Sequence, residues 1–378
     1  MLQETRYLRK KFAQKLRRPF DPARARRFLC LQMNAIGDAL MTHPAWAALK
    51  STIPDAKVDL ICRPHIAPLF RQDPSLDNIY PFETRKYHPW LFKDPRRLYD
   101  IVCQGDYDIL IDFTALPLSA AVCATRAAPP SLGFSRRIPF FCGEIELGHA
   151  FDITFPYSEE TPLRELMLHV VMPLLDPGTE LKIPRIILAE EALEKAANAL
   201  CRIGFDTQEF IVMHPGAKWP PKRWPIRHWI SLIRTLKEEI PHPFIVLGGP
   251  GDEPLIQKIA TDHVDPRVKP LLLSEIDVAA AIIKEAAICL CNDSAAMHIA
   301  AAVGTPSIAL FGPVSPNRSA PPLEAHCSVL YEKMFCSPCR LYYSRNRCRR
   351  GLNFCMFGIQ PSRVIALAKK LIERCEAC

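Results

Sequence analysis

The sequence has no uninterrupted run of about 18 apolar residues, the length that a membrane-spanning helix requires. Its most apolar stretches, residues 277–291 and 295–311, are each interrupted by charged or polar side chains. The N-terminus lacks the hydrophobic segment that precedes the cleavage site of a secretory signal. We therefore expect no transmembrane helix and a cytoplasmic protein.

The composition also lacks the biases of disordered and fibrous proteins. Hydrophobic residues make up 49% of the 378 residues and charged residues 23%, close to the average of soluble globular proteins. A chain of this length usually folds as two domains. Composition and length together indicate a globular protein of the size of an enzyme.

The net charge of +8 is confined to the start of the chain, because residues 1–28 hold three lysines and seven arginines against two acidic residues. Leu8, Phe12 and Leu16 recur at helical spacing within this extension, and Pro19 ends any helix. A basic amphipathic helix could hold the protein peripherally on the anionic inner-membrane surface. The alternative is a solvated basic tail. No nucleic-acid partner is expected, since no basic motif with interleaved aromatic residues follows.

Cysteine is abundant, and the fifteen cysteines are scattered through the predicted strands and helices, as in proteins of a reducing compartment. Four of them form a separate group with the spacing C-x2-C-x8-C-x6-C: Cys336, Cys339, Cys348 and Cys355. Four thiolates can hold a structural Zn or Fe ion. Two further hypotheses are free thiols that stabilise the arginine-rich loop around them, and a loop whose arginines contact phosphates.

Apolar strands alternate with helices through most of the chain, which indicates parallel sheets covered on both faces. We expect a basic extension at 1–27, a doubly wound Rossmann-like domain at 28–176 and a second one at 177–360. A last helical segment at 361–378 could cross back to the first domain. Ligands of such domains bind beyond the carboxyl ends of the strands, so a central cleft between the domains is expected.

The individual elements follow from the same pattern. In the first domain we expect a helix that follows the loop at 34–38 and ends near residue 51, a short helix after residue 62, helices at 91–103 and 163–175, and an unclear region at 129–158. The strands expected there are 27–33, 57–62, 78–82 and 108–113. In the second domain we expect helices at 190–201, 226–239, 253–260, 278–286 and 295–303, and strands at 210–213, 243–247, 268–273, 287–291 and 307–311.

The segment His214–Trp224 lies between a predicted strand and a predicted helix, where phosphate-contacting loops are found. Gly216 allows close approach of the backbone to a ligand, and Lys218, Lys222 and Arg223 supply positive charge. The alternative is a surface loop with solvated cations.

A second segment joins a strand to an alanine-rich helix, with Asp293 or Ser294 at the position of the helix N-cap and His298 one turn later. The free N–H groups of that helix start can bind an anion. The alternative is a capped helix without a ligand.

A third segment, Gly248–Glu253, also follows a predicted strand. Asp252 or Glu253 could accept hydrogen bonds from ribose hydroxyls there. Glycine after a strand is equally compatible with an ordinary turn.

Together these segments resemble glycosyltransferase family 9, the ADP-heptose heptosyltransferases of lipopolysaccharide core synthesis. The resemblance covers about residues 28–366 and rests on Ala35–Ala45, His214-Pro-Gly, Lys222-Arg-Trp224, Asn292-Asp-Ser, Met297-His298, the segment 300–306 and Leu310-Phe-Gly-Pro. It implies a two-domain GT-B fold in which the C-terminal domain binds the sugar nucleotide and the N-terminal domain binds the acceptor.

The resemblance also implies residue roles. Asp38 corresponds to the acid proposed as general base, although its position equally suits a helix N-cap. Lys222 corresponds to the lysine on the donor phosphates, and the donor-binding helix start contains Asp293, Ser294 and His298. This sequence has Ala295-Ala296 where the family usually has Gly-Pro, and the Cβ of Ala295 can crowd the diphosphate.

The resulting interpretation is an inverting glycosyltransferase that moves heptose from ADP-heptose to a lipid A-core acceptor. The base removes the proton of the acceptor hydroxyl, and cationic groups stabilise the departing diphosphate, so no catalytic metal is needed. The donor phosphates are expected to meet Lys218, Lys222, Ser294 and His298, and the nucleoside to meet Asp252, Glu253 and Asp293. Alternatives are another nucleotide sugar, a protein acceptor, or a non-catalytic sugar-nucleotide or glycan-binding protein of the same fold.

Overall fold

The computed structural model describes residues 21–85, 88–125, 127–139, 144–176, 178–179, 185–205, 209–262, 265–322, 325–339, 348 and 350–376. The basic stripe expected in residues 1–20 lies outside this description. The chain divides into two compact units, one ending at residue 184 and the other beginning at Arg185. This division lies eight residues after the expected boundary at 176–177.

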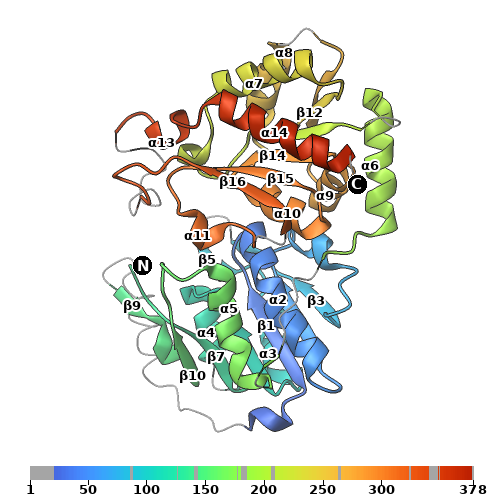
Figure 1. Cartoon of the computed structure of the whole chain (residues 1–378). Coiled ribbons are helices and arrows are strands. Elements are labelled where there is room, and N and C mark those ends of the chain that lie inside the picture. Colours follow the sequence, from blue (N-terminus) through green and yellow to red (C-terminus); the bar gives the residue numbers. More distant parts are fainter. Residues whose placement is uncertain are drawn as a thin grey trace. The chain divides into compact units, whose positions relative to one another are not determined.

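The N-terminal unit is built on a six-stranded parallel sheet with the order β10-β7-β6-β1-β2-β3 (Figure 1). Its central strand β1 is buried along almost all of its length, as expected for a strand covered on both faces. The strands of the sheet are β1 (Arg27–Gln32), β2 (Lys57–Cys62), β3 (Asn78–Pro81), β6 (Ile109–Asp112), β7 (Ser131–Ser135) and β10 (Ile153–Pro156).

The helices of this unit connect successive strands. Leu29 and Leu31 of β1 pack with side chains of α3 and α4 in one core, whereas α2 and α5 pack against each other. The helical elements are η1 (Pro22–Arg24), α2 (Ile36–Thr52), η2 (Ala67–Phe70), α3 (Pro95–Gln104), α4 (Pro117–Cys123), η3 (Leu147–Ala150), α5 (Leu163–Val171) and η4 (Met172–Leu174).

Two parts of this unit differ from the sequence-based expectation. The helix expected at 91–103 begins only at Pro95, because Asp94 caps it by accepting a hydrogen bond from Arg97 N. The residues before it form β5 (His88–Phe92), which pairs with β4 (Thr84–Arg85). The unclear region at 129–158 contains the strands β7 and β10 and a hairpin of β8 (Arg137–Pro139) and β9 (Glu144–Glu146).

The C-terminal unit repeats the architecture with a parallel sheet of the order β13-β12-β11-β14-β15-β16. Five of its strands lie within a residue or two of the expected ranges, and β16 was not expected. The strands are β11 (Ile211–His214), β12 (Phe244–Gly248), β13 (Val268–Leu272), β14 (Ile288–Asn292), β15 (Ser307–Phe311) and β16 (Cys327–Tyr331). The helical elements are α6 (Glu190–Ile203), η5 (Pro220–Lys222), α7 (Ile226–Glu239), α8 (Glu253–Thr261), α9 (Ile276–Lys284), α10 (Ala295–Val303), α11 (Pro316–Ser319), α13 (Phe354–Phe357) and α14 (Pro361–Glu376).

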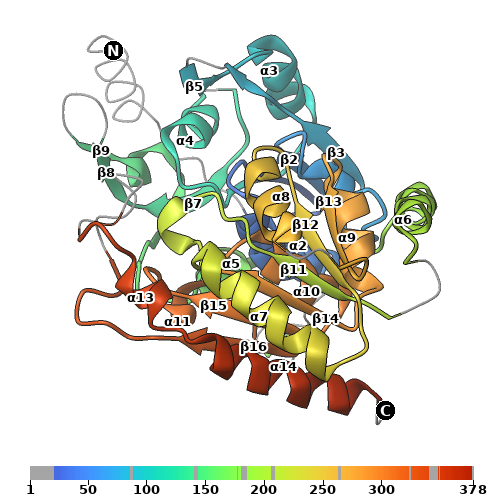
Figure 2. The ribbon, with the colours of Figure 1, turned by 90° about the horizontal axis from the view of Figure 1, so that it is seen from above.

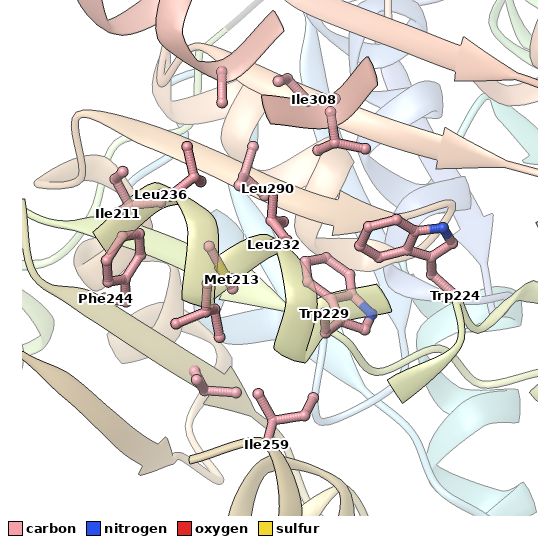
Figure 3. Close-up of a cluster of buried hydrophobic side chains, with 14 of the residues drawn as sticks. Ile211, Met213, Trp224, Trp229, Leu232, Leu236, Phe244, Ile259, Leu290 and Ile308 are labelled. Carbon is pink, nitrogen blue, oxygen red and sulfur yellow. The ribbon is translucent and has the colours of Figure 1, made fainter. Parts of the chain in front are cut away.

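One face of this sheet carries the core shown in Figure 3. Trp224 and Trp229 meet edge to face there, with ring centroids 5.0 Å apart. The last helix, α14, runs beside α7 (Figure 2) and contributes Val364, Ala368 and Ile372 to the same core. These contacts lie within the C-terminal unit, and a return of residues 361–378 to the N-terminal domain stays a prediction.

Within the described residues, none of the helices is both long and apolar enough to cross a membrane.

Candidate functional site

The candidate site of the C-terminal unit lies where its central strands end. Strand β11 ends at His214, its neighbour β12 at Gly248 and its other neighbour β14 at Asn292, and all three run parallel. The three segments singled out in the sequence therefore leave the same edge of one sheet. Such edges are the ligand-binding positions of open α/β sheets.

A buried ion pair joins two of these segments. Lys222 Nζ lies 2.8 Å from Asp293 Oδ2, and the two side chains are only 15% and 4% exposed. Lys222 is the last residue of η5, and Asp293 immediately follows β14. The pair fixes an ammonium group beside the start of α10, where helix dipole and free N–H groups also favour an anion.

Asn292 braces the same two segments, a role that its place in the sequence did not predict. Its side chain is fully buried, accepts a hydrogen bond from Trp224 N at 3.0 Å and donates one to the Pro215 carbonyl at 2.8 Å. Trp224 in turn donates its indole N–H to the Ile359 carbonyl. A polar amide at the end of an otherwise apolar strand was the available signal, because buried amides need specific partners.

Ser294 occupies the N-cap position of α10, and in the described part of the chain its side chain makes no capping hydrogen bond to the helix. Its hydroxyl instead lies 3.4 Å from His214 Nδ1. Burial lowers the pKa of His214, so the imidazole is neutral near pH 7. The first turn of α10 thus keeps its N–H groups available to a ligand.

His298 lies in the second turn of α10 and is buried. Burial, assisted by the nearby charge of Lys222, lowers its pKa to about 3. The side chain is therefore a neutral imidazole at physiological pH and can contribute one N–H donor, but no charge, to a bound anion.

Asp252 supports the loop that carries Lys222. Its carboxylate lies 3.5 Å from Arg223 and accepts a hydrogen bond from Gly249 N at 3.3 Å. It also packs against Gly216, since a Cβ placed on that glycine would be 2.5 Å from Asp252 Oδ2. The requirement for glycine at 216 thus comes at least partly from this carboxylate.

Two predicted donor-binding residues lie at the surface of this unit. Lys218 is exposed, with its ammonium 5.7 Å from the ring centroid of Trp219. Glu253 is exposed in the first turn of α8. Neither is part of the buried network around Lys222.

In the N-terminal unit, Asp38 is half-buried in the first turn of α2. Ala35 occupies the N-cap, so the suggestion that Asp38 itself is the N-cap is wrong. Its Oδ2 accepts a hydrogen bond from Ala35 N at 3.0 Å, which orients the carboxylate at the helix start. Thr42 donates to the Asp38 carbonyl and accepts from the buried side chain of Gln32, so this turn is braced against β1.

The four clustered cysteines lie at or near the surface of the C-terminal unit. Cys336 is exposed and the other three are half-buried, and burial raises the pKa of Cys355 to about 11, which disfavours its thiolate. No three His, Cys, Asp or Glu side chains gather as metal ligands within the described residues, which include all four cysteines. The surrounding residues 340–347 and 349, which supply most of the arginines, lie outside the description.

Comparison with known proteins agrees with this architecture. The family model for glycosyltransferase family 9 (heptosyltransferase) matches residues 96–349. Lipopolysaccharide heptosyltransferase 2 of Escherichia coli K12 is 24% identical over 358 residues, which span 90% of this chain and 97% of that protein.

Two solved structures share the fold. A family 9 glycosyltransferase from Veillonella parvula superimposes with a TM-score of 0.75 at 20% identity, covering 92% of this chain and 97% of the other. The ADP-heptose heptosyltransferase II of E. coli gives a TM-score of 0.73 at 21% identity, with coverages of 93% and 99%. The prediction of two Rossmann-like domains in a GT-B fold is confirmed.

Proposed function

Because the chain belongs to glycosyltransferase family 9, the heptosyltransferase family, we propose that it transfers heptose from ADP-heptose to a lipopolysaccharide inner-core acceptor with inversion at the anomeric carbon. The observation that carries the proposal is the buried Lys222–Asp293 pair at the start of α10. An ammonium group held in this position suits the diphosphate of a sugar nucleotide.

The ammonium group of Lys222 is held beside the start of α10 by its ion pair with Asp293. There its charge can act on phosphate oxygens together with the first N–H groups of α10 and the neutral imidazole of His298. As the bond from sugar to phosphate breaks, negative charge accumulates on the diphosphate, and this arrangement stabilises it. Lys218 and Glu253 would meet the donor only through side-chain movement, whereas Asp252 acts by supporting the loop.

Asp38 is proposed as the general base of the N-terminal unit. With Oδ2 engaged at Ala35 N, the carboxylate has a fixed orientation from which it can take the proton of the acceptor hydroxyl. That hydroxyl then attacks the anomeric carbon on the face opposite to the departing diphosphate, so the configuration inverts. We propose no metal in this reaction, because the cationic groups already supply the charge.

The proposal is tested by incubating the protein with ADP-heptose, ADP-glucose and a uridine diphosphate sugar, each with core oligosaccharide from a strain deleted for this gene. Mass spectrometry should show one added heptose with ADP-heptose, and NMR should show an inverted anomeric configuration. Transfer should persist in EDTA. Transfer from another nucleotide sugar alone, or only to protein, would replace the proposed substrates. Donor binding without any transfer would favour a non-catalytic protein.

We also propose that residues 1–20 hold the protein peripherally on the cytoplasmic face of the inner membrane, where the lipid A-core acceptor lies. Several basic residues at about 1 kcal/mol each near an anionic surface are enough for reversible attachment. Full-length protein should co-sediment with anionic vesicles at low salt and be released at high salt, whereas a chain beginning at Phe28 should stay in solution. Equal sedimentation of both forms would make the extension a solvated tail.

A further inference from the structure

Arg63 follows the last residue of β2 and lies at the carboxyl edge of the N-terminal sheet. Strand β2 runs parallel to β1, with Cys62 opposite Gln32, so Arg63 lies next to the end of β1. Its Nε donates a hydrogen bond to the Met33 carbonyl at 2.5 Å, and NH1 lies 3.5 Å from the Thr84 hydroxyl.

The loop that Arg63 contacts also orients the proposed base. Met33 belongs to the short connection between β1 and α2, and Ala35 in the same connection donates its N–H to the carboxylate of Asp38. The Nε bond fixes the direction of the guanidinium, and NH2 and the second N–H of NH1 remain for another ligand.

No carboxylate in the described part of the chain lies within 4.0 Å of this guanidinium, the distance limit for an ion pair. The side chain is half-buried, and burial lowers the pKa of Arg63. Two other shielded cations are paired with carboxylates, Lys50 with Asp77 at 2.7 Å and Lys222 with Asp293 at 2.8 Å. A partly desolvated charge without a counter-ion is unfavourable, and a bound anion relieves that cost.

We propose that Arg63 binds an anionic group of the acceptor, a carboxylate or a phosphate, and so brings the acceptor hydroxyl to Asp38. The identification of the ligand as the acceptor rests on the proposed function. A planar guanidinium forms two parallel hydrogen bonds to either group, which orients the sugar as well as binding it. Arg63 would thereby select acidic over neutral acceptors.

The test is calorimetric titration of the full-length protein with deacylated inner-core oligosaccharide in three forms: intact, carboxyl-reduced and phosphatase-treated. Arg63→Gln should weaken binding of the intact form about ten- to a hundredfold, and Arg63→Lys should weaken it less. Arg63→Gln and the wild type should bind with equal affinity to the one form from which the recognised group has been removed. That form shows whether Arg63 binds a carboxylate or a phosphate. Arg26→Gln is the matched control, because Arg26 is also half-buried and bonded to backbone carbonyls but lies at the amino end of β1.

An equal loss of binding for all three forms in Arg63→Gln would reduce Arg63 to a brace of the Met33 loop and overturn the proposal. The proposal would also be overturned if Arg63→Gln bound the intact form as tightly as the wild type does. The same holds if the wild-type protein did not bind the intact form. Because binding is measured without donor, failure of heptose transfer in the separate assay contradicts the proposed function and leaves this result standing.

Discussion

Lys222 and Asp293 form an ion pair of 2.8 Å in which the carboxylate is almost completely buried. The pair connects the loop after β11 with the start of α10, so the same lysine has a structural and a ligand-binding role. A change at either residue therefore alters both the stability of this edge and its affinity for a diphosphate.

Lys222→Ala should raise the KM for the nucleotide sugar and lower kcat, because the charge acts on the diphosphate before and during its departure. It should also destabilise the protein by a few kcal/mol, since Asp293 is left buried without its counter-ion. Adding Asp293→Asn should restore part of the stability but not the activity. Steady-state kinetics and urea denaturation measure both effects, with Lys258→Ala on the exposed side of α8 as control. Unchanged KM and kcat in Lys222→Ala would remove Lys222 from the donor site.

Asp38→Asn should lower kcat by about two to four orders of magnitude with little change in donor affinity. The amide keeps the shape of the side chain and an oxygen that can accept from Ala35 N, so α2 should start as before. Circular dichroism verifies the fold, and the pH dependence of kcat reports loss of the base. Turnover near the wild-type value at neutral pH would leave Asp38 as a helix-capping residue only.

Gly216→Ala should displace the loop that carries Lys222, because the new Cβ would lie 2.5 Å from Asp252 Oδ2. We expect a loss of about 1 to 3 kcal/mol in unfolding free energy and a higher KM for the donor. Gly249→Ala is the matched control, since the nearest atom to its Cβ would be 3.9 Å away. Recovery of stability in the double variant Gly216→Ala, Asp252→Ala would assign the effect to this contact, and tolerance of Gly216→Ala alone would contradict it.

Asp112→Asn should flatten the pH dependence of stability. Asp112 is fully buried, and burial raises its pKa from 3.8 to about 7. Hydrogen bonds from the Ser119 hydroxyl and from Thr114 N act in the opposite direction but do not cancel this effect. Between these two pH values the folded state retains a proton that the unfolded chain has lost, so the wild-type unfolding free energy falls as pH rises through this window.

The asparagine variant lacks this titration and should be more stable than the wild type by about 1 to 3 kcal/mol at pH 8, as measured by urea denaturation from pH 4 to pH 8. Asp77→Asn serves as the opposite control. Burial alone would raise the pKa of Asp77, but hydrogen bonds from Lys50 and Val58 N lower it below its usual value. The Asp77→Asn variant should therefore be less stable than the wild type at pH 8. Parallel pH profiles for wild type and Asp112→Asn would contradict the raised pKa.

Most of the architecture could be predicted from local patterns in the sequence. Strand Lys57–Cys62 and helices Ile226–Glu239 and Ala295–Val303 have the expected bounds, because runs of apolar residues, helical periodicity and capping residues act over short distances along the chain. The short strands β7, β10 and β16 were not recognised. Strands β10 and β16 lie at the sheet edges, where most of their residues are only half-buried and the apolar pattern is weaker, whereas β7 is buried along most of its length.

The pairing of the site residues could not be predicted from the sequence and is visible only in the folded chain. Asp293 as the partner of Lys222, Asn292 as the brace of Trp224, and the contact of Arg63 with the Met33 loop all depend on which strands are neighbours in a sheet. Motifs in the sequence marked several of these side chains, but spacing along the chain does not encode a contact between segments far apart. Strand order and burial set those contacts, and with them the charge of His298 and the lack of a counter-ion at Arg63.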